Sequence, residues 1–169
     1  MKPLAGLNEL ILYVDFDGVL HHENVYWHPR RGAYLKAPER YRLFAHSALL
    51  EEVLRPYPSV HIVLSTSWVV RYGLSETVKS LTPGLRSRVI GASYHSEMPR
   101  NSFVQLPRGQ QVWEDVLRRK PRDWLALDDD FMGWPKECLD KHIRTHPYEG
   151  ISDPEVLAEL KTKLAEMCK

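Results

Sequence analysis

The strongest constraint on the fold of this chain is a series of short, continuous apolar runs. The clearest covers residues 10–14, two more cover residues 60–64 and 124–127, and weaker ones cover 88–91 and 142–145. Runs of this length without polar alternation are typical of strands that are buried on both faces, as in a parallel sheet. The sequence therefore predicts a buried, mostly parallel sheet.

Segments with apolar residues at helical spacing lie between these runs. They cover residues 39–55, 75–81 and 109–119. A further helix is expected to follow Ser152, its predicted N-cap, with Glu155 completing a capping box. Strands that alternate with helices predict a three-layer α/β sandwich with a Rossmann-like sheet.

The segment 19–36 fits neither pattern. It contains Pro29, Gly32 and alternating aromatic residues, which favours a hairpin or flap. No Pro- or Gly-rich linker divides the chain, so we expect residues 1–169 to form a single domain.

Composition excludes several classes of protein. The net charge is +1, so binding to nucleic acid or to a membrane surface would need a local basic patch. The run at residues 10–14 is too short for a signal peptide or a membrane span. Cys138 and Cys168 lack metal-type spacing, and we expect free thiols in a reduced, cytoplasmic compartment.

Polar side chains follow three of the predicted strands, at the point where each strand ends. They are Asp15, then Ser65, Thr66 and Ser67, then Asp128, Asp129 and Asp130. In an open parallel sheet, ligands bind beyond the carboxyl ends of the strands. We therefore expect these groups to converge on one site that is suited to phosphate and metal.

The order of these groups resembles the motifs of the haloacid dehalogenase (HAD) superfamily of phosphohydrolases. LYVDFDGVL at residues 12–20 is similar to the first motif, DxDG(T/V)(L/V) after an apolar strand. The resemblance implies that Asp15 is the nucleophile that attacks phosphorus, and that Asp17 is the general acid and base. VLSTS at residues 63–67 is similar to the second motif, which binds phosphate through Ser or Thr. Thr66 is the preferred match; Ser65 is the alternative, and Ser67 is also a candidate.

LALDD at residues 125–129 is similar to the fourth motif, an acidic pair that holds Mg²⁺. The resemblance implies one Mg²⁺ held by Asp15, the backbone carbonyl of Asp17 and Asp129, with Asp128 adjacent. The third motif of the family is normally a Lys. Here the best-placed residue is Arg108, which keeps the positive charge and can bind phosphate with two hydrogen bonds.

Carboxylate chemistry agrees with this interpretation. An aspartate can form an aspartyl-phosphate and so divide a difficult hydrolysis into two steps. Mg²⁺ prefers carboxylate oxygens, phosphate and water. A dehalogenase needs no acid at position 17, so Asp17 favours phosphate chemistry.

Spacing leaves no room for a large cap domain. About 40 residues separate Asp17 from the second strand, and about 40 separate Thr66 from Arg108, and loops and short helices use most of both. Within the HAD superfamily an open site is associated with bulky substrates, or with a partner that supplies the lid, so the resemblance favours a bulky substrate. The LSTSW segment and the residues 150–152 also resemble HAD domains associated with RNA-repair proteins, which implies a phosphorylated nucleic-acid end as substrate.

The segment 21–42 interleaves basic and aromatic residues, a pattern that suits single-stranded nucleic acid; a solvated flap is the alternative. His21, His22 and His28 lack the partners of a zinc site. Trp68 and Trp113 are expected in the core.

Two alternatives to this function remain open from the sequence. One is a phosphatase of small metabolites or nucleotides, and the other is a domain that binds phosphate or a partner without catalysis. A receiver domain is disfavoured, because its acidic pair follows the first strand. Asp130 alone is more typical of a solvated loop, and Ser65, Ser67 and Arg108 also have purely structural interpretations.

Overall fold

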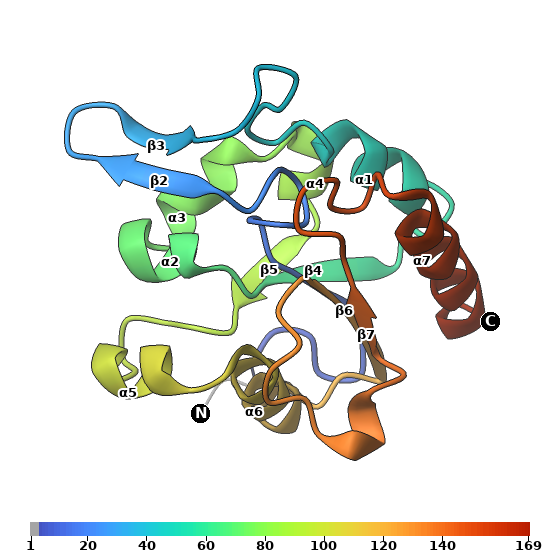
Figure 1. Cartoon of the computed structure of the whole chain (residues 1–169). Coiled ribbons are helices and arrows are strands. Elements are labelled where there is room, and N and C mark those ends of the chain that lie inside the picture. Colours follow the sequence, from blue (N-terminus) through green and yellow to red (C-terminus); the bar gives the residue numbers. More distant parts are fainter. Residues whose placement is uncertain (1–3) are drawn as a thin grey trace.

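A computed structural model describes residues 4–169, and its centre is a parallel five-stranded sheet (Figure 1). The strand order is β5-β4-β1-β6-β7. The bounds are Leu10–Val14 for β1, Val60–Leu64 for β4, Val89–Ala92 for β5, Asp123–Asp128 for β6 and His142–Arg144 for β7. All the strands predicted from the apolar runs form, and the predicted α/β class is confirmed.

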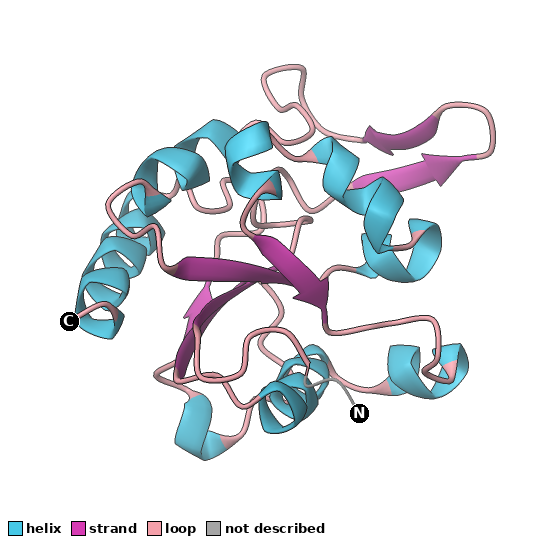
Figure 2. Ribbon diagram, turned by 180° about the vertical axis from the view of Figure 1, so that it is seen from behind, coloured by secondary structure: helices cyan, strands magenta, loops and turns pink. Residues whose placement is uncertain are grey.

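Both faces of the sheet are buried, as the unbroken apolar runs require. Leu10, Leu12 and Val14 of β1 pack in one core cluster, with residues of the helices α1 (Ser47–Leu54) and α7 (Pro154–Met167). Ile11 and Tyr13 point to the opposite face, where they pack in a second cluster with α6 (Arg108–Arg119). The domain is therefore a three-layer sandwich, with helices on both sides of the sheet (Figure 2).

Short helices complete the chain. They are α2 (Ser67–Tyr72), α3 (Leu74–Thr77), η1 (Val78–Ser80), α4 (Pro83–Arg86), α5 (Arg100–Gln105) and η2 (Lys136–Cys138). Cys138 and Cys168 are free, as predicted. No helix among residues 4–169 combines the length and the apolar character that crossing a membrane requires.

The prediction of a helix over residues 39–55 was wrong for its first half. Only α1 is helical, and the preceding residues form turns. Phe44 has a left-handed backbone (φ 57°), and its N–H donates to Nδ1 of His21. The N–H of His46 donates to the carbonyl of Leu20. Two N–H groups of this segment therefore bond to the loop after β1, and the backbone bonds within the segment are those of turns and not of a helix.

The N-cap of α7 is Asp153, and the prediction of Ser152 was wrong. The Asp153 carboxylate accepts hydrogen bonds from the N–H groups of Glu155 and Val156. The Ser152 hydroxyl donates instead to the carbonyl of Glu149. Both are good capping residues, so the position of the preceding turn decides between them.

The predicted flap is an antiparallel hairpin of β2 (Val25–His28) and β3 (Gly32–Leu35), which projects beside α2 and α3 (Figure 1). The segment between β4 and α6 contains only β5 and short helices. Among the described residues, neither insertion forms a large cap domain, in agreement with the spacing argument.

Candidate active site

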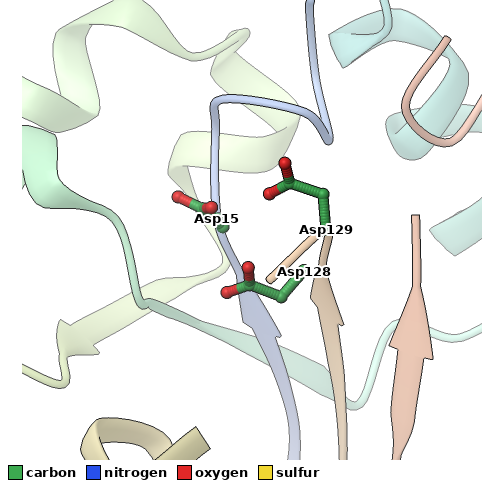
Figure 3. Close-up of side chains that lie close together, drawn as sticks. All are labelled: Asp15, Asp128 and Asp129. Carbon is green, nitrogen blue, oxygen red and sulfur yellow. The ribbon is translucent and has the colours of Figure 1, made fainter. Parts of the chain in front are cut away.

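The strand order places a crevice between β1 and β6. From β1 the chain continues to β4 and β5 on one side, and it then crosses to β6 and β7 on the other. Ligands bind at such a switch point, outside the carboxyl ends of the strands. Asp15 directly follows β1, Asp128 ends β6 and Asp129 follows it (Figure 3). One carboxylate oxygen from each of the three lies within 4.8 Å of the others.

These carboxylates repel one another in a buried setting. Burial, opposed by Arg108 and reinforced by Asp17, raises the pKa of Asp15 to about 6. Burial and the charge of Asp15 raise the pKa of Asp129 to about 7. The same two causes raise the pKa of Asp128, which is fully buried. Without a counterion, ionisation of all three carboxylates therefore costs free energy.

The donor set fits a hard divalent cation. Oδ2 of Asp128 is buried and accepts no hydrogen bond, so its lone pairs are available to a cation. Its other oxygen accepts the N–H of Asp130, which orients the carboxylate. Three convergent carboxylates match the oxygen ligands that Mg²⁺ prefers. Asp17 does not contribute its side chain to this cluster.

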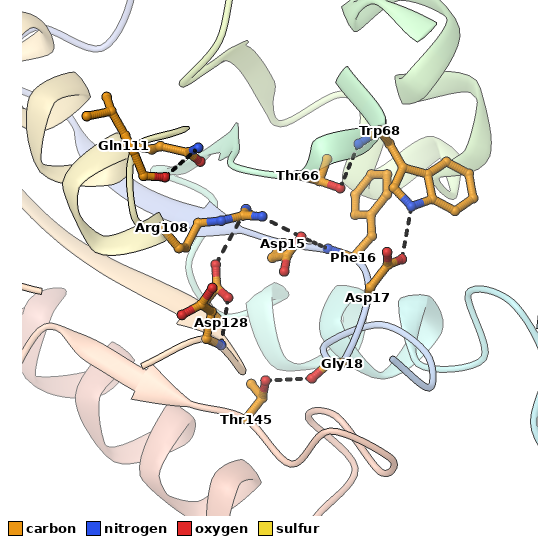
Figure 4. A network of polar contacts seen from close by, with 12 residues as sticks. Asp15, Phe16, Asp17, Gly18, Thr66, Trp68, Arg108, Gln111, Asp128 and Thr145 are labelled. Carbon is orange, nitrogen blue, oxygen red and sulfur yellow. Dashed lines mark hydrogen bonds and ion pairs between the residues drawn. The ribbon is translucent and has the colours of Figure 1, made fainter. Parts of the chain in front are cut away.

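Two hydrogen-bond donors hold the Asp17 side chain outside the metal cluster. Oδ1 of Asp17 accepts from Nε1 of Trp68 at 2.9 Å (Figure 4). The same oxygen lies 2.8 Å from Nε2 of His21. Nδ1 of His21 accepts the N–H of Phe44, so Nε2 carries the hydrogen and donates. Trp68 is buried, as predicted, but it also belongs to the site. No local pattern in the sequence indicates the roles of Trp68 and His21.

Gly18 allows the loop after β1 to approach the end of β6. Its φ is +74°, a conformation that favours glycine. A β-carbon at Gly18 would overlap the carboxylate of Asp129. The hydroxyl of Thr145, after β7, donates to the Gly18 carbonyl at 2.6 Å. The identity of residue 18 therefore permits Asp15, Asp17 and Asp129 to lie at one site.

The three hydroxyl residues after β4 reach the same edge of the sheet but differ in their surroundings. Oγ1 of Thr66 accepts from the N–H of Trp68 and caps α2, which leaves the hydroxyl hydrogen free to donate. The Ser65 hydroxyl is buried without a partner. Ser67 is exposed.

Arg108 lies over the carboxylates at the first residue of α6. Its Nη1 is 3.5 Å from Oδ1 of Asp15 and 3.6 Å from Oδ2 of Asp128. Burial would lower the pKa of the guanidinium, but the two carboxylates outweigh it and raise the pKa. A β-carbon at Gly109 would overlap the backbone of Trp134, so glycine lets the start of α6 come this close. The alternative interpretation of Arg108, as a surface residue at a helix start, is not supported, since only 15% of its side chain is exposed.

A hollow of about 520 Å³ opens over the cluster. Its lining includes Asp15, Asp17, Arg108, Asp129 and Asp130. Asp130 is exposed and its side chain accepts the N–H of Met132, as expected for a loop residue. The hollow therefore offers carboxylates and a cation to a ligand from solvent.

The comparisons with known proteins agree with this geometry. A family model described as the HAD domain in Swiss Army Knife RNA repair proteins matches residues 11–156. No curated protein and no solved structure matches the chain. The matched span covers every strand of the sheet and all the candidate site residues. The chain therefore belongs to the family of HAD domains found in Swiss Army Knife RNA repair proteins.

Proposed function

We propose that this domain is a Mg²⁺-dependent phosphomonoesterase that acts through an aspartyl-phosphate on Asp15. The observation that carries the proposal is the convergence of Asp15, Asp128 and Asp129 under Arg108 at the switch point of the sheet. Membership in the HAD family supports a hydrolase of the phosphatase type.

The proposed reaction has two steps. The Asp15 carboxylate attacks phosphorus, the bond to the ester oxygen breaks, and Asp17 gives its proton to the leaving oxygen. Asp17 then takes a proton from a water that attacks the phosphorus, which releases phosphate and restores Asp15. Because Oδ1 of Asp17 accepts two hydrogen bonds, Oδ2 is the oxygen that carries the transferred proton.

Charge must be neutralised for a phosphate to approach these carboxylates. Asp15, Asp128 and Asp129 would hold the Mg²⁺, with the Asp17 carbonyl as a further ligand, and a bound Mg²⁺ supplies positive charge that offsets the phosphate and the carboxylates. The Arg108 guanidinium stabilises the charge that develops on the phosphoryl oxygens. Thr66 and Ser67 provide hydroxyl donors to this phosphate on the side of β4.

The proposed substrate is a phosphorylated nucleic-acid end. The family description names RNA repair. No large cap covers the hollow among residues 4–169, which suits a bulky substrate. The hairpin beside it carries Arg30 and Arg31 at its tip, and both are exposed. These cations can contact a phosphate backbone.

Turnover of an aryl phosphate with Mg²⁺ tests the reaction. Wild type should hydrolyse it, Asp15→Asn should be inactive, and Asp140→Asn, at an exposed carboxylate outside the site, is the matched control. Beryllium fluoride should label Asp15. Near-normal turnover by Asp15→Asn would exclude the covalent mechanism. A comparison of phosphorylated oligonucleotides with small phosphate esters then tests the substrate, and a preference for the small esters would favour a metabolite phosphatase.

A further inference from the structure

A second hollow, of about 340 Å³, adjoins the one above the carboxylates. It lies between the start of α2, the end of β5, α5 and the start of α6. Ser67, Arg108 and Asp130 line both hollows, so the two meet at these residues. A molecule with its phosphate at Asp15 can therefore extend into the second hollow.

The second hollow is strongly cationic. Its charged lining residues are Arg71, Arg100 and Arg108 against the single carboxylate of Asp130. Arg108 already faces Asp15 and Asp128. Among the described residues, no carboxylate lies within 4 Å of the guanidinium of Arg71 or of Arg100. Two positive charges are thus left without a carboxylate partner.

Packing organises this lining. The guanidinium carbon of Arg71 lies 4.3 Å from the centre of the Trp27 ring, and a stacked guanidinium keeps its N–H donors available at its edge. Nε2 of Gln111 donates to the carbonyls of Phe103 and Leu106 and so ties the end of α5 to α6. Arg100 is the first residue of this anchored helix.

An unpaired donor also lines the second hollow. The Ser65 side chain is 2% exposed, and its hydroxyl has no hydrogen-bond partner. A buried hydroxyl without a partner costs free energy. Together with two free guanidinium groups, it gives the hollow donors and positive charge, which is the chemistry that recognises a phosphate oxygen.

We propose that this hollow binds a second phosphate group of the substrate, next to the phosphate held at Asp15. The inference rests on the proposed function for the first phosphate. Arg71 and Arg100 provide the charge, and Ser65 a hydroxyl. The second phosphate is either the neighbouring phosphodiester of a nucleic-acid strand or the second phosphate of a small bisphosphate.

Three substrates distinguish these cases. They are a nucleoside monophosphate, a nucleoside bisphosphate and a terminally phosphorylated dinucleotide, each measured with wild type and with the Arg71→Ala/Arg100→Ala variant. The variant should lower kcat/KM for the two substrates with a second phosphate by a factor at least about ten times larger than for the monophosphate, mainly by raising KM. The control is Arg122→Ala. Arg122 is exposed and precedes β6, at the opposite end of the strands from the site, so kcat/KM should not change for any of the three substrates. Loss on the dinucleotide alone identifies a strand, and loss on the bisphosphate alone identifies a metabolite.

An equal loss on all three substrates, or no loss, would overturn the inference. The first result would mean that these arginines serve only the phosphate at Asp15. The Arg71→Lys/Arg100→Lys variant separates a fold defect from a charge effect, because it should recover part of the affinity.

Binding without turnover separates this inference from the proposed function. Titration of the three ligands into Asp15→Asn with Mg²⁺ measures affinity alone. If wild type hydrolyses no substrate but binding of a two-phosphate ligand depends on Arg71 and Arg100, the proposed function fails and the second site stands. If wild type is active and the arginine variants show no differential effect, only the second site fails. No binding and no turnover would overturn both.

Discussion

The indole of Trp68 donates a hydrogen bond of 2.9 Å to the carboxylate of Asp17, which lies 51 residues earlier in the chain. This contact joins the segment after β4 to the loop after β1 (Figure 4). His21 donates to the same oxygen. The two donors fix one oxygen of the proposed acid and direct the other toward the hollow.

Removal of one of these donors should impair proton transfer more than binding. In Trp68→Phe we expect kcat to fall about tenfold for an alkyl phosphate, equivalent to one hydrogen bond to a charged group. The loss should be smaller for an activated aryl phosphate, whose leaving group needs no acid. Rates across a series of leaving groups measure the difference. Trp113→Phe, in the second core cluster, is the control. A uniform loss across the series would mean that Trp68 has only a packing role.

Arg108 should be essential for turnover. Loss of a preorganised charge beside the transition state costs on the order of 10²- to 10³-fold in kcat. Arg108→Ala should show a loss of this size, and Arg108→Lys, which keeps the charge, should recover part of it. Steady-state kinetics measure the effect, and circular dichroism checks the fold. Full activity of Arg108→Ala would indicate that Arg71 or Arg100 supplies the charge.

A rising pH should lower the thermal stability of the protein, and Mg²⁺ should raise it. Asp15 and Asp129 have pKa values of about 6 and about 7 in the folded chain, above the ordinary 3.8, so the folded state binds these protons more tightly. Their contribution to the free energy of unfolding is therefore largest below pH 4, and it is lost as the pH rises to about 7. We expect the Tm of the metal-free protein to fall over this range and Mg²⁺ to raise it at pH 8.

Asp129→Asn should weaken both effects, because it removes one titrating carboxylate and one metal ligand. Thermal melts with EDTA or with Mg²⁺ measure them, and Asp140→Asn should behave as wild type. If Mg²⁺ raised the Tm of Asp129→Asn as much as that of wild type, Asp129 would not be a ligand.

The exposed residues of the hairpin should contribute to the binding of a polynucleotide and not to the hydrolysis of a small phosphate ester. Arg30→Ala/Arg31→Ala should weaken oligonucleotide binding and reduce the salt slope by roughly two phosphate contacts. Tyr26 is 43% exposed, and its loss should cost about 1–3 kcal/mol if a base stacks on it. Hydrolysis of a small aryl phosphate is the internal control. Equal losses on both substrates would mean that the hairpin shapes the catalytic site.

The sequence could not show which aromatic ring of the hairpin is exposed to a ligand. Trp27 is the obvious stacking candidate by residue type, but its ring packs against Trp68 and Tyr72. The alternation of β2 turns Tyr26 outward instead. Which ring faces solvent depends on which face of the hairpin packs against the rest of the domain.

Local patterns were sufficient for the sheet and for the acidic cluster. A buried parallel strand can be recognised from a run of consecutive apolar residues. Since the carboxyl ends of such strands meet at one edge of the sheet, the sequence alone predicts that Asp15 and Asp128 lie close together. Residues 39–46 could not be assigned, because the N–H groups of Phe44 and His46 bond to His21 and Leu20 and not along a helix. Contacts of Asp17 with Trp68 depend on how α2 leaves the sheet, which no local pattern records.

The close approach of Gly18 to Asp129 has a mechanical consequence. No methyl group fits between the two, so a displacement of the loop after β6 pushes directly on the loop after β1. Thr145 holds the same glycine from the other side through its carbonyl. Asp17 directly precedes Gly18 in the chain, so a shift of Asp129 on binding a cation would be transmitted to the proposed proton donor. Binding of the ion and alignment of the acid would then be coupled through this one contact.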